Sequence, residues 1–258
     1  MLEVSDAQGK RVRRLTAPTT AGLHRVAWDL RYQPVDAVTG PAYKFDPEFP
    51  FSSPPPAPWA LPGTYTVRMY SRVDGTLTPL AEPVTVVVQD ADAPGARQNA
   101  RTSATLATDL RTSDLRRAVL GASALVDETQ ATLVLLKRAI DETPSADSAL
   151  IRRVRMVETS LRDAQEALRG DNTRSRRAEH APAGLLGRLN EAVGQSWGRT
   201  LEAPTPAQLT QIEIVRTAFG DLMGQLRQVV DVDLRALEAA ADAAGVPWTR
   251  GRRPVVPQ

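Results

Sequence analysis

The 258-residue sequence contains no cysteine, which excludes a disulfide framework, a thiol nucleophile and a cysteine-ligated metal site. It has only two histidines and no apolar run of the roughly 20 residues that a transmembrane helix needs. The first residues, MLEVSDAQGKRVRR, lack the apolar core of a secretory signal peptide. The sequence therefore predicts no membrane span and no exported leader within this chain.

Positive charge is not concentrated in any part of the sequence. The formal net charge is only +2, and residues 1–95 hold 9 basic and 10 acidic side chains. Nucleic-acid binding needs basic residues gathered on one face, so no nucleic-acid partner is expected. The basic loop residues Arg174, Arg176 and Arg177 could bind a phosphate, but a solvated loop is the favoured interpretation.

The motifs of the common enzyme classes are also missing. No G-x-S-x-G elbow, H-E-x-x-H pair, P-loop or G-x-G-x-x-G turn occurs in the sequence. Asp90 and Asp92 could bind calcium as a D-x-D pair, although a solvated linker is favoured. We expect no catalytic residues, no cofactor and no metal ligands, and hence no enzyme activity.

What the first 95 residues do contain is the alternation of half-buried strands. Apolar and polar residues alternate between Gly22 and Arg31 and again after the turn residues Pro62 and Gly63. Trp28 and Tyr65 fall on the apolar face, which indicates core packing. We predict strands at Leu2–Ser5, Arg11–Leu15, Gly22–Arg31, Gly63–Arg72, Leu77–Leu80 and Pro83–Gln89, with Val84–Val88 as a central strand.

Beyond residue 95 the apolar period becomes that of helices. Heptad-like seams run from Val119 to Ile140 and from Leu150 to Leu168, and a third helix is expected over residues 183–201. A fourth begins at Thr205, with Pro206 at its first position and a stripe from Leu209 to Leu237. Ser145 is expected to cap the second helix. The fold class is therefore α+β in two parts, an antiparallel sandwich at 1–95 and about four antiparallel helices at 96–250, with a disordered tail at 251–258.

A proline-rich segment at 33–61 interrupts the strands. Loops of this length are usually functional or disordered. The segment could pack against other parts of the protein, which is the favoured interpretation, or stack on a ligand such as a sugar. Its aromatic residues, the candidates for such a contact, are Tyr43, Phe45, Phe49, Phe51 and Trp59.

Three motifs resemble the immunoglobulin-like sandwich at the C-terminal end of exported BNR-repeat, sortilin-like β-propeller proteins of bacteria. They are D-x-x-G-K-x-V-R at Asp6–Arg13, A-G-L-H-R-V-x-W-D-L-R at Ala21–Arg31 and P-G-T-Y-T-V-R at Pro62–Arg68. The pattern is also similar to the sandwich of flagellar hook-capping proteins and of C-terminal sorting domains. A-P-T-x-x-Q at Ala203–Gln208 and G-V-P at Gly245–Pro247 resemble the helical region that follows in the propeller proteins.

The resemblance implies a non-catalytic accessory module of an exported, periplasmic or extracellular protein, whose partner is a propeller that this chain lacks. The full-length relatives are often labelled glycosyl hydrolases, so two alternatives remain open. One is a carbohydrate-binding accessory module, and the other is part of an active site that the propeller completes. The relatives usually have one more strand before Leu2, which implies an incomplete sandwich. We therefore expect Leu2–Ser5 or Gly22–Arg31 to be an exposed sheet edge that favours self-association.

Overall fold

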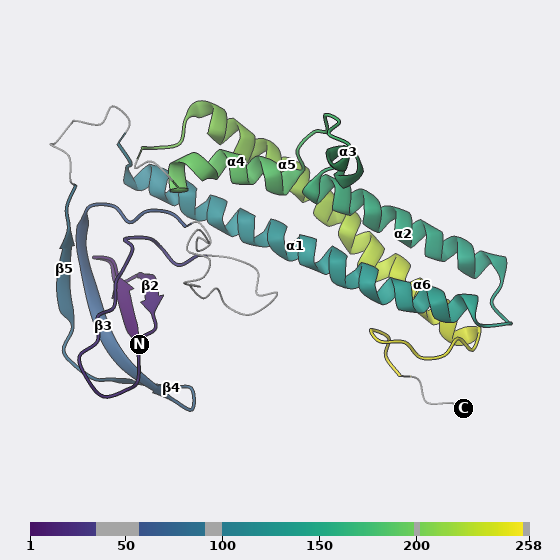
Figure 1. Ribbon diagram of the computed structural model, residues 1–258, viewed down its shortest axis with the longest axis horizontal. Helices are drawn as coiled ribbons and strands as arrows, with labels where there is room; N and C mark the ends of the chain where they lie inside the picture. Colours follow the sequence, from purple (N-terminus) through teal and green to yellow (C-terminus); the bar gives the residue numbers. More distant parts are fainter. Residues whose placement is uncertain (35–56, 91–99, 199–201, 255–258) are drawn as a thin grey trace. The chain divides into compact units, whose positions relative to one another are not determined.

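The computed structural model describes residues 1–34, 57–90, 100–198 and 202–254, and it confirms an α+β fold (Figure 1). Within these ranges, five strands precede the helices. The described residues form two compact units. The first holds 1–34, 57–90, 100–115, 192–198 and 202–208, and the second holds 116–191 and 209–254. This division differs from the boundary predicted at residue 95, because the first unit includes helical residues.

The strands form one antiparallel sheet with a long strand in its middle. The strands are β1 (Leu2–Ser5), β2 (Arg11–Leu15), β3 (Gly63–Val73), β4 (Thr76–Pro79) and β5 (Val84–Val88). β1 pairs with β2 on one side and with β3 on the other, while β3 also pairs with β4 and β5. Met1 exchanges backbone hydrogen bonds with Tyr70 on the β1 side of β3, whereas Leu80 bonds Met69 on the opposite side. β4 and β5 therefore follow one another along the second edge of β3.

Five of the six predicted strands are confirmed, but the strand predicted at Gly22–Arg31 is wrong. This segment has no ladder partner among the described residues, and only Arg31 forms an isolated bridge, with Trp59. Leu30 adopts a left-handed conformation with φ of 56°, which ends any extended run. Residues 22–30 are therefore irregular, and Trp28 packs against the sheet core from this irregular segment.

The predicted sheet edge is also corrected. β1 is paired on both sides, so Leu2–Ser5 exposes no free edge. β5 was expected to be central, yet it pairs only with β3 among the described strands, and Val84 and Val87 are 62% and 61% exposed. β2 and the β4–β5 edge are therefore the outer strands.

A small apolar core covers one face of the sheet. Val4, Val12, Tyr32 and Tyr65 are buried there, with Leu106 and Leu110 packed against them. The Trp28 and Tyr65 rings meet edge to face, with centroids 5.1 Å apart, so the core interpretation of both aromatics is confirmed.

The helices are α1 (Ser103–Asp141), α2 (Ser148–Arg169), α3 (Asn172–Arg176), α4 (Leu185–Gly198), α5 (Pro206–Arg227) and α6 (Leu234–Ala243), with a π-helix, η1, at Gln228–Asp233. The predicted seams of the first two helices are buried throughout, and on α5 only Leu209 is exposed among the predicted stripe. Asp147 caps α2 by accepting from the Leu150 N–H, so the prediction that Ser145 is the cap is wrong. The Ser145 hydroxyl instead donates to the Ala244 carbonyl.

The π-helix explains how one apolar face continues from α5 into α6. In a regular helix the residue four positions after Val229 is Asp233, which would turn its carboxylate toward the core. The wider turn places Leu234 there, and its N–H bonds the carbonyl of Val229, five residues earlier. Val229, Leu234, Leu237 and Ala241 consequently share the core of the second unit with α1 and α2.

Two further features of the second unit bear on the predictions. Arg252, placed in a disordered tail by the sequence, is buried, pairs with Asp242 and donates to the carbonyl of Pro247. Among the described helices, α1 is the one long and apolar enough to cross a membrane by length and composition. Of the 18-residue stretch that meets this criterion, 39% is buried: Leu133 lies in the core, whereas Val134 and Leu135 are 63% and 41% exposed.

Candidate functional site

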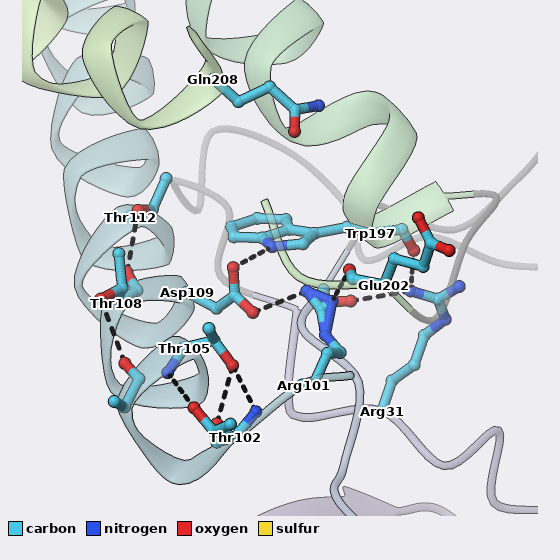
Figure 2. Close-up of polar contacts among 12 residues, drawn as sticks. Arg31, Arg101, Thr102, Thr105, Thr108, Asp109, Thr112, Trp197, Glu202 and Gln208 are labelled. Carbon is cyan, nitrogen blue, oxygen red and sulfur yellow. Dashed lines mark hydrogen bonds and ion pairs between the residues drawn. The ribbon is translucent and has the colours of Figure 1, made fainter. Parts of the chain in front are cut away.

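Asp109, on the first turns of α1, is the most deeply buried charged group among the described residues of the first unit. Its side chain is 3% exposed and lies 2.6 Å from the Arg101 guanidinium, which is 5% exposed. The other carboxylate oxygen accepts a 2.9 Å hydrogen bond from the indole N–H of Trp197, a fully buried residue near the end of α4. Figure 2 shows these three side chains converging from separate segments.

Local sequence fixes where Asp109 points. Thr102 precedes α1, and its side chain accepts from the Thr105 N–H while Thr105 accepts from the Thr102 N–H. This reciprocal bonding satisfies backbone donors at the start of the helix, as in a capping box. Asp109 lies seven residues after Thr102, two helical turns, and therefore on the same side of the helix as the capping residue.

Burial dominates the electrostatics of the pair. It raises the pKa of Asp109, and the hydrogen bond from Trp197 and the charge of Arg101 offset only part of that rise. Burial likewise lowers the pKa of Arg101 against the opposing effect of Asp109. Both shifts mean that desolvation of the two ions is expensive and that each depends on the other.

Arg31 extends the cluster toward the sheet. Its guanidinium donates to the carbonyl of Ala57, at 2.8 Å, and to the carbonyl of Trp197. It also stacks on the Trp59 ring, with Cζ 3.5 Å from the centroid, which is a favourable cation–π geometry. Asp29, two residues earlier, forms an ion pair with Arg13 of β2 at 3.6 Å.

A backbone contact completes the cluster on the side of α5. Ala100 and Glu202 form an isolated antiparallel bridge, and Arg101 reaches the Glu202 carbonyl at 3.4 Å. Thr205 and Gln208 then cap α5, since the Gln208 side chain accepts from the Thr205 N–H at 2.8 Å. The cluster therefore joins the segment after β2, the start of α1, the end of α4 and the segment before α5.

Chemically, this arrangement holds segments together and leaves Asp109 no room to react. Both carboxylate oxygens already accept charge-assisted or indole hydrogen bonds, and the group is sealed from solvent. A general acid or base must reach the proton that it transfers, within about 3 Å or through one water. Asp109, whose two oxygens accept from Arg101 and Trp197 and whose side chain is 3% exposed, is poorly placed for such a transfer.

The candidate contact residues named from the sequence are only partly described. Tyr43, Phe45, Phe49 and Phe51 lie outside the described residues. Trp59 is half-buried, and its ring engages Arg31 of the same unit. Asp92 is likewise outside the described residues, and Arg174 pairs with Asp171 at 3.5 Å.

The second unit contains an open cavity of about 370 Å³ between the end of α2, α3 and residues 182–184. Three carboxylates line it, Asp163, Glu166 and Asp171. Asp171 is committed to α3, because it accepts from the backbone N–H groups of Thr173 and Arg174. Across the described ranges, no group of three or more side chains is arranged to hold a metal ion.

Sequence reasoning missed the Arg101–Asp109–Trp197 cluster. It assigned Asp109 no role. The available signal was an acidic residue one turn from Leu106 and next to Leu110, on the helix face that packs on the sheet core.

The chain matches no protein-family model, no curated protein and no solved structure.

Proposed function

We propose that this chain is a non-catalytic structural module of an exported BNR-repeat, sortilin-like β-propeller protein, serving domain packing or protein–protein interaction. The observation that carries the proposal is the Arg101–Asp109–Trp197 cluster. A buried ion pair contributes little net stability against an apolar alternative, but it penalises every arrangement that separates its members. Such a cluster suits a module whose task is to hold four chain segments in one geometry.

Several residues of the motifs that resemble the family form turns and helix caps. In the first motif, Asp6 accepts from the Gln8 and Lys10 N–H groups, and Gly9 takes φ of 76° to close the turn. In the helical motif, Thr205 and Gln208 cap α5. We include in the proposal that the sheet is the described part of an Ig-like sandwich and that the helices form an antiparallel bundle. The antiparallel hairpins and the Trp28–Tyr65 pair support the first point.

The contact between Arg31 and Trp59 favours packing over carbohydrate binding. The Arg31 guanidinium covers one face of the Trp59 ring, with Cζ 3.5 Å from the centroid, so that face is not available to stack on a sugar. The same guanidinium bonds two backbone carbonyls, so its removal to admit a ligand would break those bonds.

The experiment starts from the coding sequence upstream of this chain. Where it encodes a propeller, that propeller is expressed separately and titrated into the purified chain in a calorimeter. We expect saturable one-to-one binding, and no turnover of aryl-glycosides by the chain. An upstream sequence without a propeller, no heat of binding, or turnover that a single carboxylate substitution abolishes would each overturn the proposal.

A further inference from the structure

The two outer edges of the sheet differ in how strongly their side chains oppose pairing with a further strand. β2, with the sequence RVRRL, carries Arg11, Arg13 and Arg14, and charged side chains on an edge oppose pairing with another strand. β5, with the sequence VTVVV, carries no charge, and four of its five residues are exposed. Its second edge has no partner strand among the described residues, as the left side of the sheet in Figure 1 shows.

The apolar side chains of β5 continue the core of the sheet. Val86 pairs with Tyr65 and Val84 with Val67, so Val84, Val86 and Val88 share the face of the buried Tyr65. Val88 packs against the core, whereas Val86 is 37% and Val84 62% exposed. Leu80, bonded to Met69 on the same edge, is 55% exposed. An apolar row thus runs along β5, from Val88 in the core to the exposed Val84.

We propose that β5 pairs with β5 of a second copy of this chain, antiparallel about a two-fold axis at Val86. This pairing goes beyond the proposed function and does not depend on it. In this register Val86 faces Val86 of the second copy, Val84 faces its Val88, and Thr85 faces its Val87. Every pair is β-branched, and each valine row meets the matching row on the same face.

The sequence on either side of β5 restricts the register. Pro83 has no N–H to donate, so a shift that brings it into the ladder loses a hydrogen bond. If one β5 strand slid by one residue along the other, the core-face valines of one copy would lie on the same side of the joined sheet as the opposite face of the second copy. Because the other edge carries the arginines of β2, the pairing closes at two copies and does not propagate.

A strand pair of this length buries little area, so the affinity is expected in the micromolar range. Sedimentation equilibrium of the full chain between about 5 and 200 μM should show a reversible monomer–dimer equilibrium. Val86→Lys should weaken it at least tenfold, because two ammonium groups would then lie opposite each other across the axis. Val86→Glu should do the same.

The decisive measurement mixes the two variants. Lys and Glu at position 86 would face each other across the axis, so the mixture should regain a dimer that neither variant forms alone. Val87→Lys, on the opposite face of β5, is a second variant that should weaken the dimer without touching the core. Val73→Lys is the matched control, since Val73 is 66% exposed on β3 beside β4, and its association should equal that of the original chain.

Several outcomes would overturn the proposal. They are a monomer throughout the concentration range, mass rising beyond the dimer, equal weakening by Val73→Lys, or no dimer in the Lys–Glu mixture. Circular dichroism of each variant establishes that it is folded. If a variant at position 86 is unfolded, the test is the comparison of Val87→Lys with Val73→Lys. The proposal then requires that Val87→Lys weakens the dimer and that Val73→Lys does not.

Discussion

The stability of the first unit is expected to depend strongly on one residue, Asp109, because it is buried together with its ion-pair partner. Its ion pair with Arg101 is almost fully desolvated, whereas the side chains of the Lys137–Glu158 pair are 45% and 35% exposed at a similar distance of 2.8 Å. Removing one member of a buried pair leaves the other charge in a medium that cannot solvate it. Removing one member of an exposed pair leaves a charge that water solvates.

Asp109→Asn should therefore lower the free energy of unfolding by about 3–5 kcal/mol, because it removes the carboxylate charge that the buried Arg101 guanidinium contacts at 2.6 Å. Trp197→Phe, which deletes one donor to the carboxylate, should cost about 1.5–3 kcal/mol. Glu158→Gln is the control and should cost less than about 1 kcal/mol. Urea unfolding followed by circular dichroism measures all three. An Asp109→Asn variant whose stability lies within about 1 kcal/mol of the original chain would contradict the role given to the cluster.

Tyr32 supplies a pH-dependent test of the sheet core. Burial, followed by the nearby Tyr65 and Asp6, raises the pKa of Tyr32 to about 12. The folded pKa exceeds the unfolded value of about 10, so folding favours the protonated phenol. The stability that this contributes is fully present below pH 10 and is lost as the pH rises toward 12.

Tyr32→Phe should accordingly flatten the alkaline loss of stability by about 1–2 kcal/mol between pH 10 and 12. Part of the loss should remain, because burial also raises the pKa of Tyr65. Unfolding by urea at a series of pH values from 9 to 12 measures the slope for both chains. Parallel curves would show that Tyr32 does not ionise as part of unfolding.

Among the elements, the entry into α4 depends on a backbone contact that only glycine permits. A Cβ on Gly184 would lie 2.3 Å from the backbone N of Gly170 and 2.6 Å from the backbone C of Arg169. Those atoms end α2, whose last turn is held by the bond from the Gly170 N–H to the Glu166 carbonyl. Neither can move aside as a flexible side chain could.

Gly184→Ala should thus destabilise the chain by more than about 2 kcal/mol through backbone displacement. Gly187→Ala is the matched control inside α4, where the new Cβ would meet only the Ala183 Cβ at an ordinary 3.4 Å. There alanine should stabilise by about 0.5–1 kcal/mol, because it favours the helix. Thermal unfolding of the two variants should shift in opposite directions, and shifts of equal sign would contradict the close-approach argument.

Local pattern predicted the elements well where one element buries one face. The buried seams of α1 and α2 follow from 3-4 spacing, and β3 follows from alternation after Gly63. The pattern failed where contacts between distant segments determine the backbone conformation or the exposure of a residue. Trp28 reaches the core from irregular backbone, η1 widens one turn to bring Leu234 inward, and β5 is apolar although it lies at an edge.

The cluster at Asp109 could not be predicted for a related reason. Arg101, Asp109 and Trp197 span 96 positions of the sequence, and no local period links them. Trp59 was a candidate contact residue only because it is an aromatic residue of the 33–61 segment. Its partner Arg31 precedes that segment, 28 positions earlier in the sequence. Pairing across such separations depends on the fold of the whole first unit.

At the scale of the whole molecule, two helices belong to both units. α1 contributes Ser103 to Leu115 to the first unit and the rest of its length to the second, and α4 is divided between Glu191 and Ala192. Unfolding one unit alone would have to end both helices in the middle. Each new helix end leaves up to four backbone groups without their partners, so partial unfolding is penalised.

The two units should therefore unfold cooperatively, which hydrogen exchange read by mass spectrometry can measure. Peptides from β3 in the first unit and from α2 in the second should give maximal opening free energies that agree within about 1 kcal/mol. Asp109→Asn alters only the first unit, yet it should lower protection of the α2 peptides about as much as that of β3. Glu158→Gln, in the second unit, should change neither by more than about 1 kcal/mol. Loss of protection confined to β3 would show that the shared helices do not couple the units, since α2 would then keep its structure while the Asp109 cluster opens.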